Sequence, residues 1–155
     1  MLPNAYLTSK QLEIWSLLRK GLSKAEVGRR LGITRQAVYD AEKISLARVE
    51  AALQAAADTN SISVIYADAG KGVLLGHSPV TRNRVIITFS AKNGVQTWHY
   101  EHPECGECAA IEKCRKRLLE EADERGVPIS DNQRNLPPSR LAHIIFSEIV
   151  PGLQP

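Results

Sequence analysis

Two short segments near the N-terminus, each with a glycine followed by a residue that favours the start of a helix, most constrain what this chain can fold into. Gly21 is followed two residues later by Ser23, and Gly32 is followed two residues later by Thr34. Glycine often ends a helix in the left-handed conformation, and serine and threonine are favoured at a helix start. The spacing therefore predicts three consecutive helices, of which the middle one is short, about nine residues.

The polar residues at the helix starts strengthen this prediction. Thr8 and Gln11 have capping-box spacing, and Ser23 and Glu26 repeat it. Two short helices joined by a turn of three to four residues that contains glycine are typical of a helix-turn-helix unit. Residues 1–58 are therefore predicted to form a helix-turn-helix DNA-binding domain. The alternative is a compact three-helix bundle used for protein contacts.

The start of the third helix carries polar side chains suited to reading DNA. With Val38 and Ala41 turned inward, the exposed side chains would enter the major groove, and the N-terminus of the helix would lie against phosphate. Arginine can pair with guanine and glutamine with adenine, while tyrosine can meet a thymine methyl group or a phosphate. The predicted DNA-binding residues are Thr34, Arg35, Gln36, Tyr39, Lys43, Ser23 and Lys24.

The charge of the chain is concentrated at the same end. The formal net charge is only +3. Residues 1–48 contain nine lysines and arginines against four acidic residues, whereas the two kinds balance from residue 59 onward. A polyanionic partner such as double-stranded DNA would therefore meet the N-terminal part.

These N-terminal residues resemble a known family. Segments 7–14, 21–27 and 31–38 are similar to the DNA-binding unit of LuxR-type and sigma-region-four-type proteins, and most similar to the archaeal Tfx family of transcriptional regulators. The resemblance covers residues 6–58 and implies a sequence-specific regulator of transcription. Beyond residue 60 we match no motif of that family.

The third helix is predicted to continue as a long helix, since residues 44–57 contain no helix breaker and are rich in strong helix formers. Its apolar residues form two stripes, one to close the small bundle and one for a partner. We therefore expect a homodimer that reads two half-sites. The alternative is that the second stripe packs against the C-terminal part of the same chain. The stripes are Leu46, Val49, Leu53 and Ala56, and Ile44, Ala47, Ala51 and Ala55.

The rest of the chain, residues 59–155, changes to a strand-like pattern. Short alternating apolar runs and the turn at residues 92–94 predict a four-stranded, largely antiparallel sheet over about residues 62–101. Helices are expected over 109–125 and 139–149, where Gly126 and Pro151 end them. The whole chain is predicted to be α+β, with an all-helical N-terminal domain and a sheet plus two helices after it.

The C-terminal part contains one candidate metal site. Cys105 and Cys108 have the Cys-x2-Cys spacing that binds one ion from a tight turn, and Cys114 follows in the first turns of a helix. His102, or alternatively His99, would complete a Cys3His zinc site. The cysteine spacing also resembles part of a [4Fe-4S] motif that lacks one ligand. Three reduced thiols without metal are the remaining alternative.

We predict a sequence-specific, dimeric DNA-binding transcriptional regulator whose metal-containing part is structural or sensory. The alternatives are a DNA-repair or other nucleic-acid enzyme with a structural cluster, and a sigma-like adaptor that contacts RNA polymerase. The sequence contains no phosphate-binding loop, nucleophile elbow or paired-carboxylate motif, so we expect no enzyme. It also lacks a membrane span and a signal peptide, which predicts a cytoplasmic protein.

Overall fold

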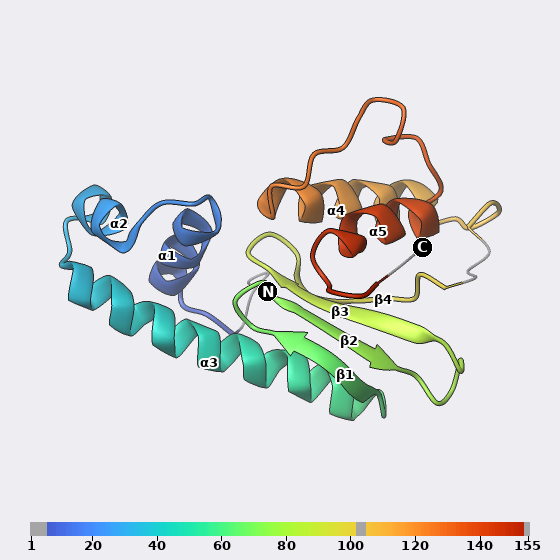
Figure 1. Ribbon diagram of the computed structural model, residues 1–155, viewed down its shortest axis with the longest axis horizontal. Helices are drawn as coiled ribbons and strands as arrows, with labels where there is room; N and C mark the ends of the chain where they lie inside the picture. Colours follow the sequence, from blue (N-terminus) through green and yellow to red (C-terminus); the bar gives the residue numbers. More distant parts are fainter. Residues whose placement is uncertain (1–5, 102–104, 154–155) are drawn as a thin grey trace.

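The computed structural model describes residues 6–101 and 105–153, which form an elongated α+β protein (Figure 1). Helices come first, four antiparallel strands follow, and two helices end the chain. The predicted α+β class is confirmed. The elements are α1 (Ser9–Arg19), α2 (Lys24–Leu31), α3 (Arg35–Thr59), β1 (Ser63–Asp68), β2 (Val73–His77), β3 (Arg84–Ser90), β4 (Gly94–Trp98), α4 (Ile111–Glu124) and α5 (Pro138–Ser147).

Side-chain caps begin the first three helices where the sequence predicts. At α1 both halves of the capping box form, because Thr8 Oγ1 accepts from the Gln11 N–H at 3.2 Å and Gln11 Oε1 accepts from the Thr8 N–H at 3.0 Å. At α2 only the Ser23 half forms among the described residues, in which Ser23 Oγ accepts from the Glu26 N–H. Each cap satisfies a helix N–H that lacks an intrahelical partner.

The sheet has the order β1-β2-β3-β4, and α4 and α5 cover one of its faces (Figure 1). Inward residues alternate along β3, so that Ile86 packs toward α4 and α5 while Ile87 and Phe89 pack toward α3. The predicted strand over residues 84–90 is present, and Gly94 supplies the positive φ of +66° at the end of the following turn.

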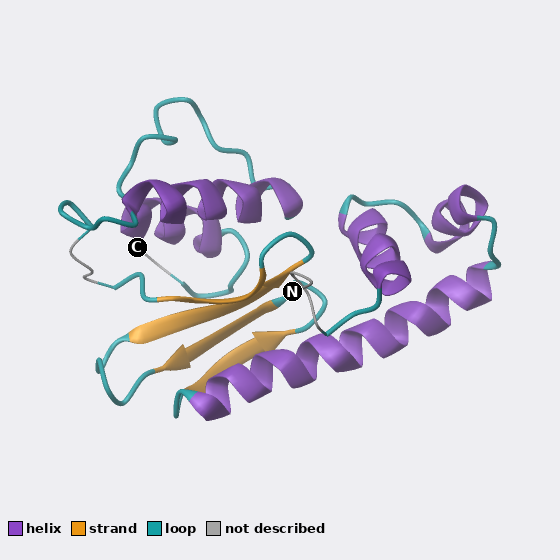
Figure 2. Cartoon of the chain, turned by 180° about the vertical axis from the view of Figure 1, so that it is seen from behind, coloured by secondary structure: helices purple, strands orange, loops and turns teal. Residues whose placement is uncertain are grey.

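Helix α3 belongs to both parts of the molecule. Its 25 residues form one straight helix that carries α1 and α2 beside its first half and packs on the sheet with its second half (Figure 2). Val49 and Leu53 are buried in one core with Leu74 and Phe89 of the sheet. A boundary between residues 58 and 59 falls at the end of the helix, but the hydrophobic core crosses it.

The two C-terminal helices differ slightly from the predicted ranges. Residue 109 lies in a turn rather than in α4, which begins at Ile111 after Ala110, a residue without a side-chain cap. Helix α5 ends at Ser147 instead of residue 149, because Glu148 and Ile149 donate to carbonyls three residues back and tighten the last turn.

A buried ion pair joins α4 to the sheet. Glu121 is fully buried and accepts from Arg125 Nη1, while Arg125 Nη2 donates to the carbonyls of Gly72 and Phe89 at 3.0 and 2.8 Å. Burial raises the pKa of the Glu121 carboxyl, and the Arg125 guanidinium opposes that rise. The pair is therefore a costly but well-bonded tie between α4 and the sheet.

Candidate nucleic-acid interface and the adjoining groove

The connection between α2 and α3 is a tight turn built on two glycines. Gly32 ends α2 with φ +68°, and the Ile33 N–H donates to the Gly28 carbonyl at 2.9 Å. A Cβ on Gly28 would lie 2.7 Å from the Ile33 carbonyl oxygen, which is closer than such atoms approach. The turn thus requires glycine at 28, and it brings the start of α3 close against α2.

The start of α3 exposes the predicted polar side chains. Tyr39 is 49% exposed, and Arg35, Gln36 and Lys43 are also exposed, while Val38 is fully buried. Gln36 Nε2 donates to Asp40 Oδ1 at 3.0 Å, one helical turn away. These side chains share one solvent-facing side of α3, as the predicted reading surface requires.

The cap residues lie at the edge of the same surface. Thr34 Oγ1 accepts from the Ala37 N–H at 3.0 Å, and its hydroxyl group can still donate a hydrogen bond to another acceptor. Ser23 has the equivalent position at the start of α2. Both helix starts combine a hydroxyl donor with free backbone N–H groups, which is a chemistry that suits phosphate oxygens.

Lys24 is engaged within the chain. Its Nζ lies 3.2 Å from Glu42 Oε2, and the pair joins α2 to α3. A contact between Lys24 and a phosphate would therefore compete with Glu42, whereas Arg35 and Lys43 form no ion pair with the described residues.

The second stripe of α3 faces away from the protein. Ile44 is 48% exposed, and Ala47, Ala51 and Ala55 are exposed along the same side. The first stripe is the one that packs on the sheet, through Val49 and Leu53. The second stripe has no partner within the described part of the chain.

The cysteine segment forms a turn before α4. The Cys108 N–H donates to the Cys105 carbonyl at 3.2 Å, and Cys114 lies in the first turn of α4. All three thiols are free, and no group of three or more His, Cys, Asp or Glu side chains that could hold a metal occurs among the described residues. His102, the first choice for the fourth ligand, lies outside those residues. His99 is exposed just after β4.

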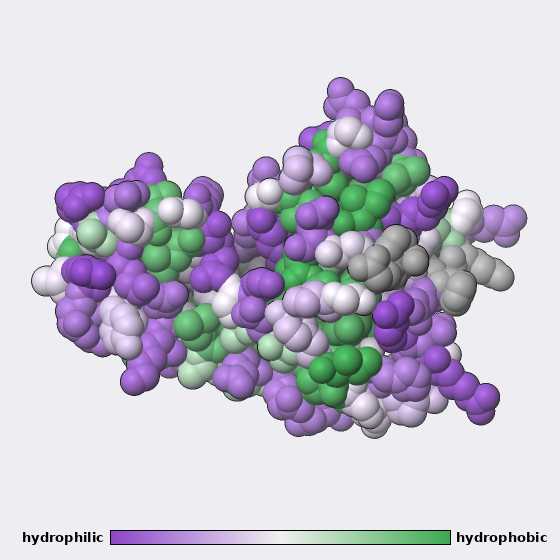
Figure 3. Space-filling view, in the orientation of Figure 1, coloured by the Kyte–Doolittle hydropathy of each residue, from purple (hydrophilic) through white to green (hydrophobic). Residues whose placement is uncertain are grey.

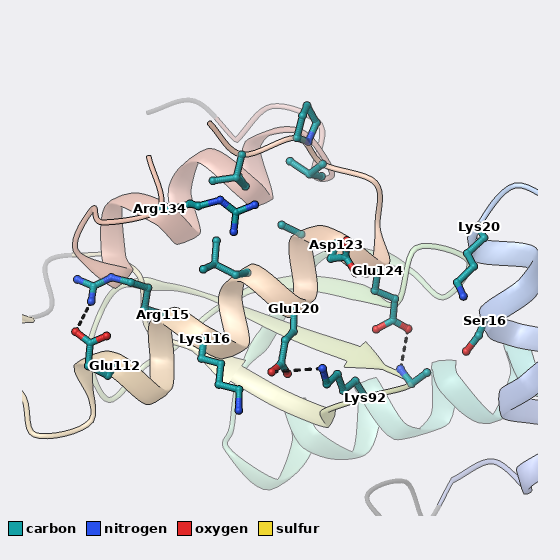
Figure 4. A pocket seen from close by; sticks show the side chains of 16 residues that line it. Ser16, Lys20, Lys92, Glu112, Arg115, Lys116, Glu120, Asp123, Glu124 and Arg134 are labelled. Carbon is teal, nitrogen blue, oxygen red and sulfur yellow. Dashed lines mark hydrogen bonds and ion pairs between the residues drawn. The ribbon is translucent and has the colours of Figure 1, made fainter. Parts of the chain in front are cut away.

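A groove of about 890 Å³ lies along α4 and is lined also by the loop after α4, by the β3–β4 turn and by residues 16 and 20 near the end of α1. Figure 3 shows the notch between the α1–α2 lobe and the rest of the molecule, and Figure 4 shows the groove lining from close by. Ser16 comes from α1, Lys20 is the residue that follows α1, and Lys92 comes from the β3–β4 turn. The groove therefore joins the helical unit to the sheet-containing part.

Unpaired polar atoms gather beside this groove. Glu124 Oε1 accepts from the Ala91 N–H at 2.8 Å, but Glu124 Oε2 is buried and has no hydrogen-bond partner in the described structure. Arg19 stacks over Trp15, 4.3 Å from the ring centroid, and its buried Nε is likewise unpartnered there. Desolvation by burial lowers the pKa of Arg19.

Sequence reasoning did not predict the groove. Its walls come from segments around residues 16–20, 91–92, 112–124 and 127–134, and no local motif connects them. Figure 4 shows Lys20 and Ser16 across from Glu124, a relationship that only the folded chain creates.

Comparisons with known proteins identify no relative: no family model matches the chain, and neither a curated protein nor a solved structure shows significant similarity to it. The resemblance of residues 6–58 to the Tfx family thus stays a prediction. None of the described helices is both long and apolar enough to cross a membrane.

Proposed function

We propose that this chain is a sequence-specific, helix-turn-helix DNA-binding regulator of transcription. The observation that carries the proposal is the polar surface at the start of α3, where Arg35, Gln36, Tyr39 and Lys43 are exposed beside two capped helix starts. Guanidinium and amide groups are the side chains that read base edges in the major groove. The surplus of positive charge at this end of the chain favours the same polyanionic partner.

We further propose that the regulator is a dimer formed through α3. At 3.6 residues per turn, the exposed stripe from Ile44 to Ala55 is turned roughly 110° from the reading surface. The stripe also points away from the sheet. Two antiparallel α3 helices that met along this stripe would therefore present both reading surfaces on the same side of the dimer.

The length of α3 suits this arrangement. The centre of the stripe lies about 11 residues beyond the centre of the reading surface, or about 16 Å along the helix. Two-fold pairing about the stripe doubles that distance to about 33 Å, close to the 34–36 Å of one turn of B-DNA. A dimer of this kind would meet two half-sites in successive major grooves.

Selection of bound sequences from a random duplex library tests the proposal. We expect a palindromic site with half-site centres about 10 base pairs apart. Binding without sequence preference, or no binding of duplex DNA at low salt, would contradict it. The R35A/Q36A/Y39A variant is the control, because its substitutions lie on exposed positions and leave the core residue Val38 in place.

A further inference from the structure

An acidic side chain lies on the proposed reading surface of α3. Asp40 is exposed, follows Gln36 by one helical turn and precedes Lys43 by three residues. It takes part in none of the ion pairs among the described residues. A carboxylate on a surface that meets DNA repels the phosphate backbone and lowers the affinity for every sequence. The position of Asp40 therefore points to a role in the choice of sequence and not in affinity.

Asp40 holds the amide of Gln36 in one orientation. Gln36 Nε2 donates to Asp40 Oδ1 at 3.0 Å. An ionised carboxylate accepts hydrogen bonds but cannot donate one, so the reverse orientation of the amide would set its oxygen against another acceptor. The contact therefore leaves Gln36 with its oxygen and one N–H group to offer to a partner.

Adenine is the base that matches this pair of groups. In the major groove the adenine N6 amino group donates and N7 accepts, so adenine can bond to an amide oxygen and an amide N–H together. Guanine presents two acceptors, O6 and N7, and one of them would face the amide oxygen. A glutamine without a neighbouring carboxylate can turn its amide and offer nitrogen to guanine instead. The contact with Asp40 disfavours that alternative.

We propose that Asp40 is a positioning residue that restricts Gln36 to adenine. Gln36 contacts the base, whereas Asp40 acts through Gln36 and contacts no base itself. The carboxylate lowers the affinity for all duplexes, while it raises the ratio of the affinities for adenine and guanine at one position of the half-site. This assignment rests on the proposed function, because it requires the start of α3 to lie in the major groove.

The same helix contains a matched pair of residues outside the reading surface. Gln54 Nε2 donates to Asp58 Oδ1 at 2.9 Å, again with a spacing of four residues, and both side chains are exposed. This pair lies about 27 Å further along α3 than Gln36 and Asp40. Glutamine and aspartate at this spacing stabilise a helix slightly. A substitution of Asp58 therefore alters the same kind of helix contact without changing the proposed base contacts.

Competition binding with single-base variants of the selected operator tests the proposal. Q36A first identifies the half-site position at which Gln36 acts, and we expect the wild type to prefer adenine there. D40N keeps the size of the side chain, but its amide can donate as well as accept, so Gln36 is no longer held in one orientation. The preference for adenine over guanine at that position should fall about threefold or more in D40N.

Two further variants separate this role from a general effect on charge or on the helix. D40E retains a carboxylate one turn from Gln36, so its preference for adenine should stay within about twofold of the wild type. D58N should leave the preference unchanged, although it alters the matched pair. All the substituted positions are exposed, and circular dichroism checks that each variant is folded.

The proposal is overturned if D40N keeps the wild-type ratio, if D58N lowers the ratio as much as D40N, or if the wild type prefers another base at the position that Q36A identifies. It is also overturned if D40N changes a different position, since Asp40 would then contact a base itself. In each of these cases the sequence-specific binding of the wild type leaves the proposed function intact. A wild type that binds duplex DNA without preference would refute the proposed function and this assignment together.

Discussion

The rings of Trp15 and Phe89 meet edge to face, with centroids 5.5 Å apart and planes at 89°. Trp15 belongs to α1 and Phe89 to β3, and both side chains are buried. This contact joins the helical unit to the sheet in the same core that contains Val49 and Leu53 of α3. The two parts of the chain therefore share one core.

We predict that the whole protein unfolds in a single transition. Replacing Phe89 by alanine should lower the free energy of unfolding by about 3–5 kcal/mol, because it leaves a cavity under Trp15. The measurement uses W15F and W98F, each with one tryptophan, since Trp15 lies at the contact and Trp98 lies in the core under α5. Denaturation midpoints that differed between the two reporters would show that the parts unfold separately.

Arg35 is predicted to read a base. Arg35→Ala should relax the preference at one position of the half-site, at a cost of about 1–3 kcal/mol for the preferred base. Lys24→Ala should instead weaken binding to all sequences alike, and only slightly, because Lys24 is already paired with Glu42. Competition binding with single-base variants of the selected site separates the two patterns. Equal losses on every sequence for Arg35→Ala would refute the orientation of the reading surface.

Ala51 lies at the centre of the exposed stripe of α3. Ala51→Glu places a charge where two stripes would meet, so we expect a monomer that binds one half-site with reduced affinity. Sedimentation equilibrium gives the oligomeric state, and circular dichroism checks the fold. Glu50→Gln, on the neighbouring face of the same helix, is the control. A dimer that survives Ala51→Glu unchanged excludes this stripe as the interface.

Glu121 should make stability depend on pH. Burial raises its pKa in the folded protein above the ordinary value of 4.5, so the folded state holds a proton that the unfolded state has released. The contribution of this proton to the free energy of unfolding is fully present below pH 4.5 and is lost as the pH rises above that value. The amide that Glu121→Gln introduces cannot titrate, so wild-type stability relative to this variant should fall as the pH rises above 4.5.

Urea denaturation of both proteins across that range measures the difference. A difference that increased with pH would mean that attraction to Arg125 outweighs desolvation and that the pKa is lowered. Arg125 retains the carbonyl groups of Gly72 and Phe89 as partners in the variant, which favours a folded protein.

The cysteine segment still predicts a bound metal. Anaerobically purified protein should be colourless and contain one zinc per chain, and C105S/C108S should lose it. A brown protein with iron would select the cluster instead. Metal-free protein after anaerobic purification would indicate three reduced thiols without metal. Cys114→Ser would then behave like the wild type.

Local signals predicted much of the architecture. Thr8, Ser23 and Thr34 begin helices where capping spacing placed them, and the run at residues 84–90 forms β3. These features depend on contacts between residues close in sequence. The end of α5 was predicted less well, because Glu148 and Ile149 donate to carbonyls three residues back and form a turn instead of continuing the helix.

Other features could not be predicted from local pattern. The contact between Trp15 and Phe89 and the facing positions of Lys20 and Glu124 join segments far apart in the chain. The run at residues 84–90 predicted a strand, but not that α3 covers one of its faces. The packing of α3 on the sheet turns a predicted two-domain chain into one with a shared core.

Helix α3 contains neither glycine nor proline from Arg35 to Thr59, so it has no residue at which a helix readily kinks. In the proposed dimer the length of α3 therefore fixes the distance between the two reading surfaces. The spacing between half-sites is set by the number of residues in α3, because the helix has no hinge that could change this distance. Operators whose half-sites lie half a turn of DNA too close together or too far apart would not fit the dimer, even when every base is correct. The specificity of binding would then depend partly on the length of α3.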